Sequence, residues 1–360
     1  MKCDIILLVW NELQLTKDCL ESFFRHTHYP HRLILVDNGS EQETAEYLKG
    51  LKEKKDTEIS LIRNEKNAGF VKAINQGMKA SDAPYVCLLS NDILLGDNWL
   101  AEMIAAAESN AQIGIVNPSS NTLGQILKED SVDSYAKSLK DFKGQWQELG
   151  RCEGFCMLIK REVIDKIGFL DEIFSPYFFE ESDFCRRTQE AGFKCARAKA
   201  SYVYHEGSAT LKKRPHEKER IYKKNYDIFC RRWGKPLKIA YVASGRSKIK
   251  QDRINKIALL AAKDNHQIWI FLKKSQRISY DFDGQSNVRF FWLNDYFYNI
   301  LSICKMLKKT PKKSPNIIIS DNRMLSSIFK KLKFYHKADV LFEPSLEKAR
   351  QLWKQKSVYP

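Results

Sequence analysis

The hydrophobic pattern of the first ninety residues predicts a series of buried strands separated by helices. Short apolar runs typical of strands lie at residues 4–10, 32–36, 59–62 and 85–89, and polar residues follow each run directly. The segments between them place apolar residues on one helical side, at 16–25, 40–53 and 70–80. This βαβαβαβ alternation predicts a mostly parallel sheet with helices on both faces.

The pattern is less regular further along the chain. Residues 117–150 are polar and predict an irregular, flexible segment on the substrate side, which contains Trp146. Regularity returns with a strand at 155–159, a helix at 161–167, a helix that ends at 191–192 and a short strand at 202–205. A basic helix at 215–233 ends at Gly234, and Pro236 follows, which predicts a domain boundary there. We therefore expect domains at 1–235 and 236–360.

A second alternation occupies the last third of the chain. Strand patterns at 238–243, 267–272, 288–292, 316–320 and 339–342 predict a smaller Rossmann-like α/β domain. The longest apolar runs are too short to span a bilayer, and the N-terminus predicts no secretory signal. Nine cysteines without CxxC pairs indicate reduced thiols in the cytoplasm rather than disulfides or zinc.

The net positive charge of the chain comes entirely from the second predicted domain. Residues 236–360 hold 25 Lys+Arg and 9 Asp+Glu, a net charge of +16, so residues 1–235 hold 35 of each and are neutral. Lysines gather at 305–313 and 330–337. This asymmetry predicts that the second domain meets an anionic surface or polymer.

Acidic residues occur at three places in the first domain where ligands are expected. Asp37 and Asp92 follow the second and fourth strands, and Glu180 and Glu181 open a later helix. The carboxyl ends of parallel strands share one edge of a sheet, so Asp37 and Asp92 should face one crevice. Divalent Mg²⁺ or Mn²⁺ prefers oxygen ligands and is often shared with phosphates, so Asp92 is a candidate metal ligand. Either aspartate could instead cap the following segment.

A series of motifs in this order resembles family 2 glycosyltransferases of the GT-A fold, over roughly residues 3–235, and bacterial rhamnosyltransferase-like members in particular. The motifs are Val9–Glu12, Val36–Ser40, Asn67–Phe70, Asn75–Gly77, Leu89–Asp92, Gly154–Phe155, Phe169–Glu172, Phe179–Arg187 and His205–Ser208. The resemblance implies a GT-A nucleotide-sugar-binding domain with a mostly parallel sheet. It also implies transfer of a sugar from a nucleotide donor, with Mg²⁺ or Mn²⁺.

The same resemblance implies roles for matching positions. Asp37 corresponds to a contact with the donor nucleoside, and Asp92 to the metal-bound carboxylate of a DxD motif in which Ser90 replaces the first aspartate. His205 corresponds to a histidine near the donor phosphates, often a metal ligand. Further residues of these motifs are expected to bind the donor: Asn11, Asn67, Gly69 and Asn91.

The catalytic base is expected in the Phe-Glu-Glu-Ser-Asp run. The family usually has Asp at the position of Glu181, which leaves Glu180 and Asp183 as competitors. Inverting transfer requires one base for the acceptor proton and positive charge on the leaving diphosphate. Asp183 is a candidate acceptor contact, although a structural ion pair with Arg187 is the stronger reading. Trp146 could stack on an acceptor sugar or anchor a loop in the core.

Residues 236–360 resemble, more weakly, the N-terminal half of family 4 GT-B glycosyltransferases. The similarity lies in Ile239–Gly245 and Ala338–Ser345. In that family this half mainly faces the acceptor, and the donor-binding half follows it. We therefore expect either that the sequence is truncated or that this domain is not an enzyme by itself.

The sequence as a whole predicts a cytoplasmic glycosyltransferase that acts at the inner face of the cell membrane. We expect a UDP- or dTDP-sugar donor, a cell-surface glycan or lipid-linked acceptor, and an anionic membrane surface as the partner of 236–360. The alternatives are a nucleotidyltransferase and a non-catalytic protein that binds nucleotide sugars or anionic polymers. Trp10-Asn11-Glu12 supplies no Gly-rich phosphate loop for the former, and no nucleic-acid motif accompanies the basic charge.

Overall fold

The computed structural model describes residues 2–53, 57–127, 131–207, 215–244, 247–275, 285, 287–307 and 314–359. The chain divides into two compact units, Met1–Phe229 and Cys230–Pro360. Helix α8 (Pro215–Trp233) crosses this division and ends next to the boundary expected from Gly234 and Pro236. Each unit is described by itself.

One side of the first unit's sheet is the predicted parallel α/β arrangement. The strand order is β3-β2-β1-β4, and every neighbouring pair is parallel. The strands are β1 (Cys3–Val9), β2 (His31–Asp37), β3 (Glu58–Arg63) and β4 (Tyr85–Ser90). Their carboxyl ends therefore share one edge, as the sequence predicted.

The other side of this sheet corrects the prediction of an irregular segment at 117–150. The order continues β4-β8-β6-β9-β5, with β7 paired to β9, and β8 runs antiparallel to both β4 and β6. The strands are β5 (Ile93–Leu95), β6 (Ile113–Ser119), β7 (Trp146–Leu149), β8 (Cys156–Lys160) and β9 (Lys194–His205). The same segment also contains helix α5 (Val132–Ser138) and two 3₁₀ turns, Asn121–Leu123 and Lys140–Phe142.

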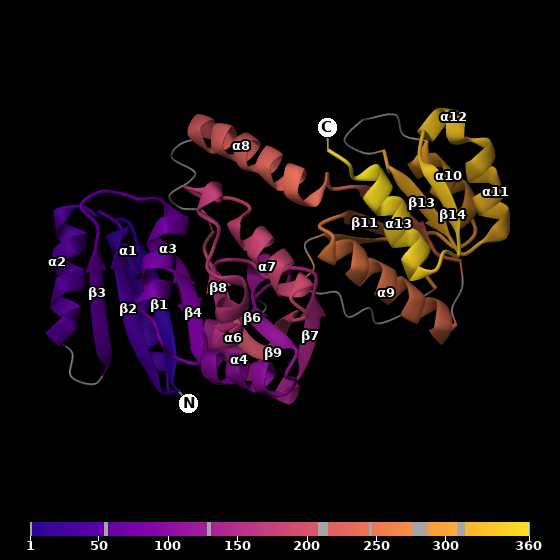
Figure 1. The fold of residues 1–360 in the computed structure, drawn as a ribbon. Helices are drawn as coiled ribbons and strands as arrows, with labels where there is room; N and C mark the ends of the chain where they lie inside the picture. Colours follow the sequence, from indigo (N-terminus) through magenta and orange to yellow (C-terminus); the bar gives the residue numbers. More distant parts are fainter. Residues whose placement is uncertain are drawn as a thin grey trace. The chain divides into compact units, whose positions relative to one another are not determined.

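Helices cover both faces of the first sheet (Figure 1). One core contains side chains of α1 (Leu13–His26), α2 (Gln42–Gly50) and α4 (Trp99–Glu108). The opposite core contains those of α3 (Phe70–Lys79), α6 (Arg161–Ile167) and α7 (Glu180–Glu190). β1 alternates between them, with Ile5 and Leu7 in the first core and Ile6 in the second.

The second unit is the predicted smaller, doubly wound α/β unit. Its sheet has the order β12-β11-β10-β13-β14, all parallel. The strands are β10 (Lys238–Val242), β11 (Gln267–Lys273), β12 (Val288–Leu293), β13 (Ile317–Ser320) and β14 (Asp339–Phe342). Helices α9 (Lys248–Lys263) and α13 (Leu346–Lys356) pack on one face, and α10 (Tyr298–Met306) and α11 (Arg323–Lys331) on the other. Helix α12 (Lys333–His336) follows α11.

Some residues of the sequence predictions lie outside the described residues. These are Ser208, Gly245 and the lysines at 308, 309, 312 and 313. Among the helices that the structure describes, none is both long and apolar enough to cross a bilayer.

Candidate active site

Hydrogen bonds join the loops that follow β1 and β2. The Asn11 backbone N–H donates to Ser40 Oγ at 3.0 Å, and Asn11 Oδ1 accepts from the Glu41 backbone N–H at 2.8 Å. Asn11 and Glu12 both have positive φ, 57° and 51°, which is uncommon for non-glycine residues and occurs often at functional sites. Asn11 therefore fixes the loop that begins α1.

Asp37 is fully buried at the end of β2. Its Oδ1 accepts from the Ser40 backbone N–H at 2.9 Å, and its Oδ2 pairs with Arg63 Nη1 of β3. The carboxylate thus stabilises the strand ends in this structure, and a contact with a donor nucleoside stays a prediction.

An amide network joins β2 to the loop before α3. Asn38 Nδ2 donates to Asn67 Oδ1 at 3.0 Å, and Asn67 Oδ1 also accepts from the Gly69 backbone N–H at 2.8 Å. Gly39 has φ +76°, and a Cβ there would lie 2.6 Å from the backbone of Lys66. The glycine is required for this close approach, which brings the loop at 66–69 onto the strand end.

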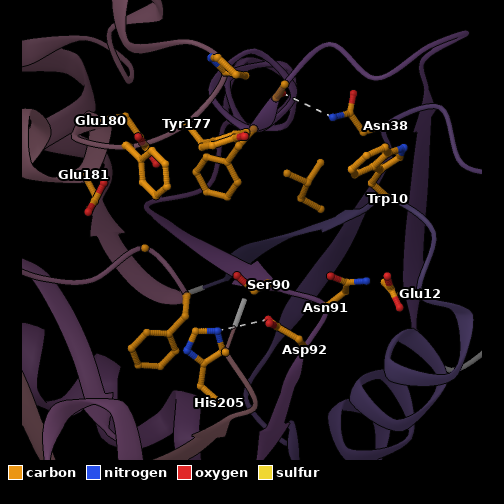
Figure 2. A pocket seen from close by; sticks show the side chains of 18 of the residues that line it. Trp10, Glu12, Asn38, Ser90, Asn91, Asp92, Tyr177, Glu180, Glu181 and His205 are labelled. Carbon is orange, nitrogen blue, oxygen red and sulfur yellow. Dashed lines mark hydrogen bonds and ion pairs between the residues drawn. The ribbon is translucent and has the colours of Figure 1, made fainter. Parts of the chain in front are cut away.

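Asp92 and His205 meet because strands β5 and β9 pair antiparallel. Ile93 lies opposite His205, and the Glu206 N–H donates to the Asp92 carbonyl at 3.0 Å. Asp92 Oδ1 and His205 Nε2 are 3.3 Å apart. A dashed line marks this contact in Figure 2. The His205 imidazole stacks on Phe155 with ring centroids 4.9 Å apart. The Asn121 side chain accepts a hydrogen bond from the His205 backbone N–H and donates one to the His205 carbonyl.

This pair fits part of a cation site. A carboxylate oxygen and an imidazole nitrogen suit Mn²⁺, and a carboxylate with phosphate oxygens suits Mg²⁺. His205 Nδ1 is buried without a hydrogen-bond partner, so the ring has a second nitrogen still to satisfy. The described residues contain no group of three or more His, Cys, Asp or Glu side chains able to hold a metal. A cation here would need further ligands from a substrate.

An unusual backbone directs two glutamates into one cavity at the start of α7. Phe178 and Phe179 have φ of 78° and 73°, conformations that bulky residues rarely adopt. Directly after them, Glu180 and Glu181 open the helix, and both side chains line the cavity.

Both glutamates titrate above the ordinary range. Burial and the neighbouring Glu181 raise the pKa of Glu180 well above its usual value, and Glu180 Oε2 has no hydrogen-bond partner. Burial also raises the pKa of Glu181, to about 7, and the Arg151 cation opposes that rise. At neutral pH, Glu181 is therefore near its midpoint, whereas burial favours the neutral acid at Glu180.

Arg151 is held beside these carboxyls. Its Nη2 donates to Glu153 Oε1 at 2.7 Å and its Nη1 to Ser182 Oγ at 3.2 Å. Burial alone would lower the pKa of Arg151, but Glu153 and Glu181 raise it above its usual value. A permanent cation therefore stabilises the ionised form of Glu181.

The Asp92–His205 pair and the two glutamates line one cavity of about 810 Å³ (Figure 2). It is also lined by other predicted site residues, namely Asn67, Gly69 and Asn91. The structure does not bring Asn11, Asp37, Asp183 or Trp146 to its lining. Of these, Asn11 and Asp37 are adjacent in sequence to Trp10, Glu12 and Asn38, which do line it.

The two candidate acceptor residues each make contacts within the fold. Asp183 is fully buried, and Arg187 Nε donates to its Oδ2 at 2.8 Å, the ion pair considered from the sequence. Trp146 lies in β7, packs against the core and has Lys194 Nζ 5.9 Å from its ring centroid. An acceptor contact by either residue stays a prediction.

Sequence reasoning missed Asn225 of α8, which supports the cavity wall. Asn225 is fully buried, and its Nδ2 donates to the carbonyls of Phe174 at 2.6 Å, Tyr177 at 2.8 Å and Phe178 at 3.3 Å. Tyr177 and Phe178 line the cavity. A lone Asn in a basic helix gives no sequence signal for this role. Glu153 was also missed, although it lies beside the predicted Gly154–Phe155 motif.

Comparison with known proteins gives a family match over this unit. The profile of glycosyl transferase family 2 matches residues 4–168. The poly-β-1,6-N-acetyl-D-glucosamine synthase of Staphylococcus epidermidis is 26% identical over 171 residues, which cover 46% of this chain and 41% of that protein. The uncharacterised protein y4gI of Sinorhizobium fredii is 26% identical over 250 residues, covering 64% of this chain and 27% of that protein. The chain thus spans well under two thirds of these relatives.

A solved structure is similar with a lower sequence identity. The mannosyltransferase PcManGT from Pyrobaculum calidifontis, in complex with GDP-Man and Mn²⁺, has a TM-score of 0.49 and 15% identity, covering 72% of this chain and 68% of that chain. The family match begins in β1, contains the whole parallel half of the sheet and ends after α6. Residues 4–168 of the first unit are thus similar to glycosyl transferase family 2.

Proposed function

We propose that the first unit transfers a sugar, with inversion, from a nucleoside-diphosphate donor to a hydroxyl of a glycan or lipid-linked acceptor. The donor is expected to be a UDP- or dTDP-sugar. The observation that carries this proposal is one cavity lined both by the Asp92–His205 pair and by the Glu180–Glu181 pair. The first is suited to a cation on a diphosphate, and the second to proton removal.

The charge of the cavity supports a need for a divalent cation. Its described lining contains six acidic side chains and no lysine or arginine; the acidic residues are Glu12, Asp92, Glu153, Glu180, Glu181 and Glu217. A diphosphate would be repelled there unless Mg²⁺ or Mn²⁺ accompanied it. Asp92 and His205 would hold this cation. When bound, it would neutralise charge on the departing diphosphate.

Glu181 is the proposed base. Its pKa of about 7 lets it exist as a carboxylate at neutral pH and still accept a proton readily. In the proposed displacement, the acceptor oxygen bonds to the anomeric carbon as the bond from that carbon to the diphosphate oxygen breaks. The hydroxyl proton passes to Glu181. Burial raises the pKa of Glu180 well above its usual value, so its protonated form would donate a hydrogen bond instead.

The second unit is proposed to hold the enzyme at an anionic membrane surface on the cytoplasmic side. The net charge of +16 on residues 236–360 supports this placement, because each Lys or Arg near such a surface contributes about 1 kcal/mol. An acceptor carried on a lipid phosphate would be presented at the same surface.

The test is a panel of nucleotide sugars assayed for release of nucleoside diphosphate, with and without EDTA. We expect one or a few donors to support metal-dependent release that an acceptor glycan accelerates. A nucleotidyltransferase would instead consume a nucleoside triphosphate and release pyrophosphate, and a non-catalytic protein would release nothing. The family match favours the first outcome.

A further inference from the structure

Exposed apolar side chains are concentrated in the second unit. Of the fifteen large hydrophobic residues that are exposed in the described parts of the chain, eleven belong to this unit. Residues 236–360 of the same unit carry a net charge of +16. Apolar and basic groups exposed together are typical of surfaces that bind membranes or partner molecules.

Both features meet at one corner, where α11 ends and α12 follows at the periphery of the unit (Figure 1). We call it the basic corner, and its members are Lys330, Lys331, Lys333, Phe334, Tyr335 and Lys337. The Phe334 side chain is 86% exposed and that of Tyr335 55%. Their rings lie edge to face with centroids 5.7 Å apart, and the lysines beside them in sequence are exposed.

Buried residues anchor the basic corner to the core of the unit. His336 Nδ1 accepts from the Ala338 backbone N–H at 3.0 Å, so its Nε2, 2.8 Å from the Phe329 carbonyl, is the donor there. Phe329 is fully buried in the core on this face of the sheet. Since Phe329 and His336 occupy the inward positions, Phe334 and Tyr335 are kept pointing outward.

The chemistry of the corner matches the interfacial region of an anionic bilayer. Aromatic rings are stable at the depth of lipid headgroups, and lysines beside them can reach the phosphates. Asp339 accepts from Lys333 and Lys356 at 2.7 Å each, so it is already neutralised. Two exposed rings beside exposed lysines suit a lipid surface better than a groove or a stack of bases.

We propose that the basic corner is the element that attaches this enzyme to an anionic lipid bilayer, with Phe334 and Tyr335 inserted among the headgroups. This deepens the proposed function, in which the second unit holds the enzyme at the membrane. The test is co-sedimentation of the full chain with phosphatidylcholine vesicles, with and without phosphatidylglycerol. Wild type should bind only the anionic vesicles, and salt should weaken the binding.

Matched variants distinguish an effect of the basic corner from an effect of net charge alone. Lys330→Glu/Lys331→Glu should lower vesicle partitioning at least about tenfold. Lys348→Glu/Lys354→Glu makes the same charge change on exposed positions of α13, which packs on the other face of the sheet, and should have a much smaller effect. Phe334→Ser should weaken binding, whereas Phe334→Leu should retain it.

Two results would overturn the proposal: failure of the wild type to bind anionic vesicles, or equal losses in both lysine pairs. Transfer to soluble acceptors should be unchanged in every corner variant. Vesicle binding without transfer would therefore count against the proposed function alone, and transfer without vesicle binding against the corner alone.

Discussion

At the residue scale, the pKa values of two adjacent glutamates are raised to different degrees because their neighbours differ. Arg151 lies beside Glu181 and favours its ionised form, whereas burial and Glu181 itself raise the pKa of Glu180 well above its usual value. The dipole of α7 would favour ionisation of both, but the desolvation of a buried carboxyl outweighs this partial charge. The sequence identified the pair, and the burial and the cation at Arg151 come from parts of the chain that only folding brings together.

Glu181→Gln keeps the shape of the side chain and removes the base. Turnover should fall roughly 10²–10⁴-fold while donor binding persists. In the wild type, kcat/KM should rise with pH through about 7, as the carboxyl of Glu181 loses its proton, and this rise should vanish in the variant. Glu180→Gln is the matched control, since it makes the same change at the neighbouring glutamate of the cavity lining. An inactive Glu180→Gln with an active Glu181→Gln would move the base by one residue.

Asp92→Asn tests the proposed cation site. The amide retains a weak oxygen ligand without charge, so Mn²⁺ affinity should fall at least about tenfold and transfer should be nearly abolished. Free Mn²⁺ can be measured by electron paramagnetic resonance, with nucleoside diphosphate present. Asp97→Asn, a nearby partly exposed aspartate outside the cavity lining, should leave both quantities unchanged. Full activity of Asp92→Asn in excess EDTA would contradict the metal role.

At the element scale, the first strands were predictable and the second half of the sheet was not. β1, β2 and β4 are continuous apolar runs, so periodicity locates them. β6 carries Asn117, whose Nδ2 donates to the Cys156 and Glu153 carbonyls at 2.5 and 3.0 Å. A polar residue buried through such distant partners gives no strand signal in the local sequence. The pairing of β5 with β9, which creates the Asp92–His205 contact, could not be predicted either, because it joins a three-residue strand to residues 203–205, far along the chain.

Asn225→Ala tests how α8 supports the cavity wall. The change leaves three carbonyls of residues 174–178 without their donor, which should lower the free energy of unfolding by about 1–3 kcal/mol. Because this segment precedes Glu180, kcat should also fall, and acceptor KM should rise. Chemical denaturation and steady-state kinetics measure both effects. A stability loss with unchanged kinetics would limit Asn225 to a structural role.

At the scale of the whole molecule, the charge asymmetry was readable from composition because net charge needs no knowledge of the fold. What composition could not supply is the distribution of that charge over the surface. Part of it is used internally, as in the contact of Lys250 Nζ with buried Asp321 Oδ2 at 3.4 Å. Only the exposed lysines can face a partner, which is why the arrangement around α12 matters more than the total.

The last prediction separates chemistry from attachment. A fragment of residues 1–235 retains the compact first unit and all of α8, including Asn225. It should release nucleoside diphosphate from the donor with the same metal dependence as the full chain, because every lining residue of the cavity lies within it. It should not sediment with anionic vesicles, since its net charge is zero. Circular dichroism and thermal melting confirm that the fragment is folded. Equal vesicle binding by fragment and full chain would remove the attachment role of the second unit. A folded fragment that binds donor but cannot turn it over would show that residues 236–360 contribute to the chemistry.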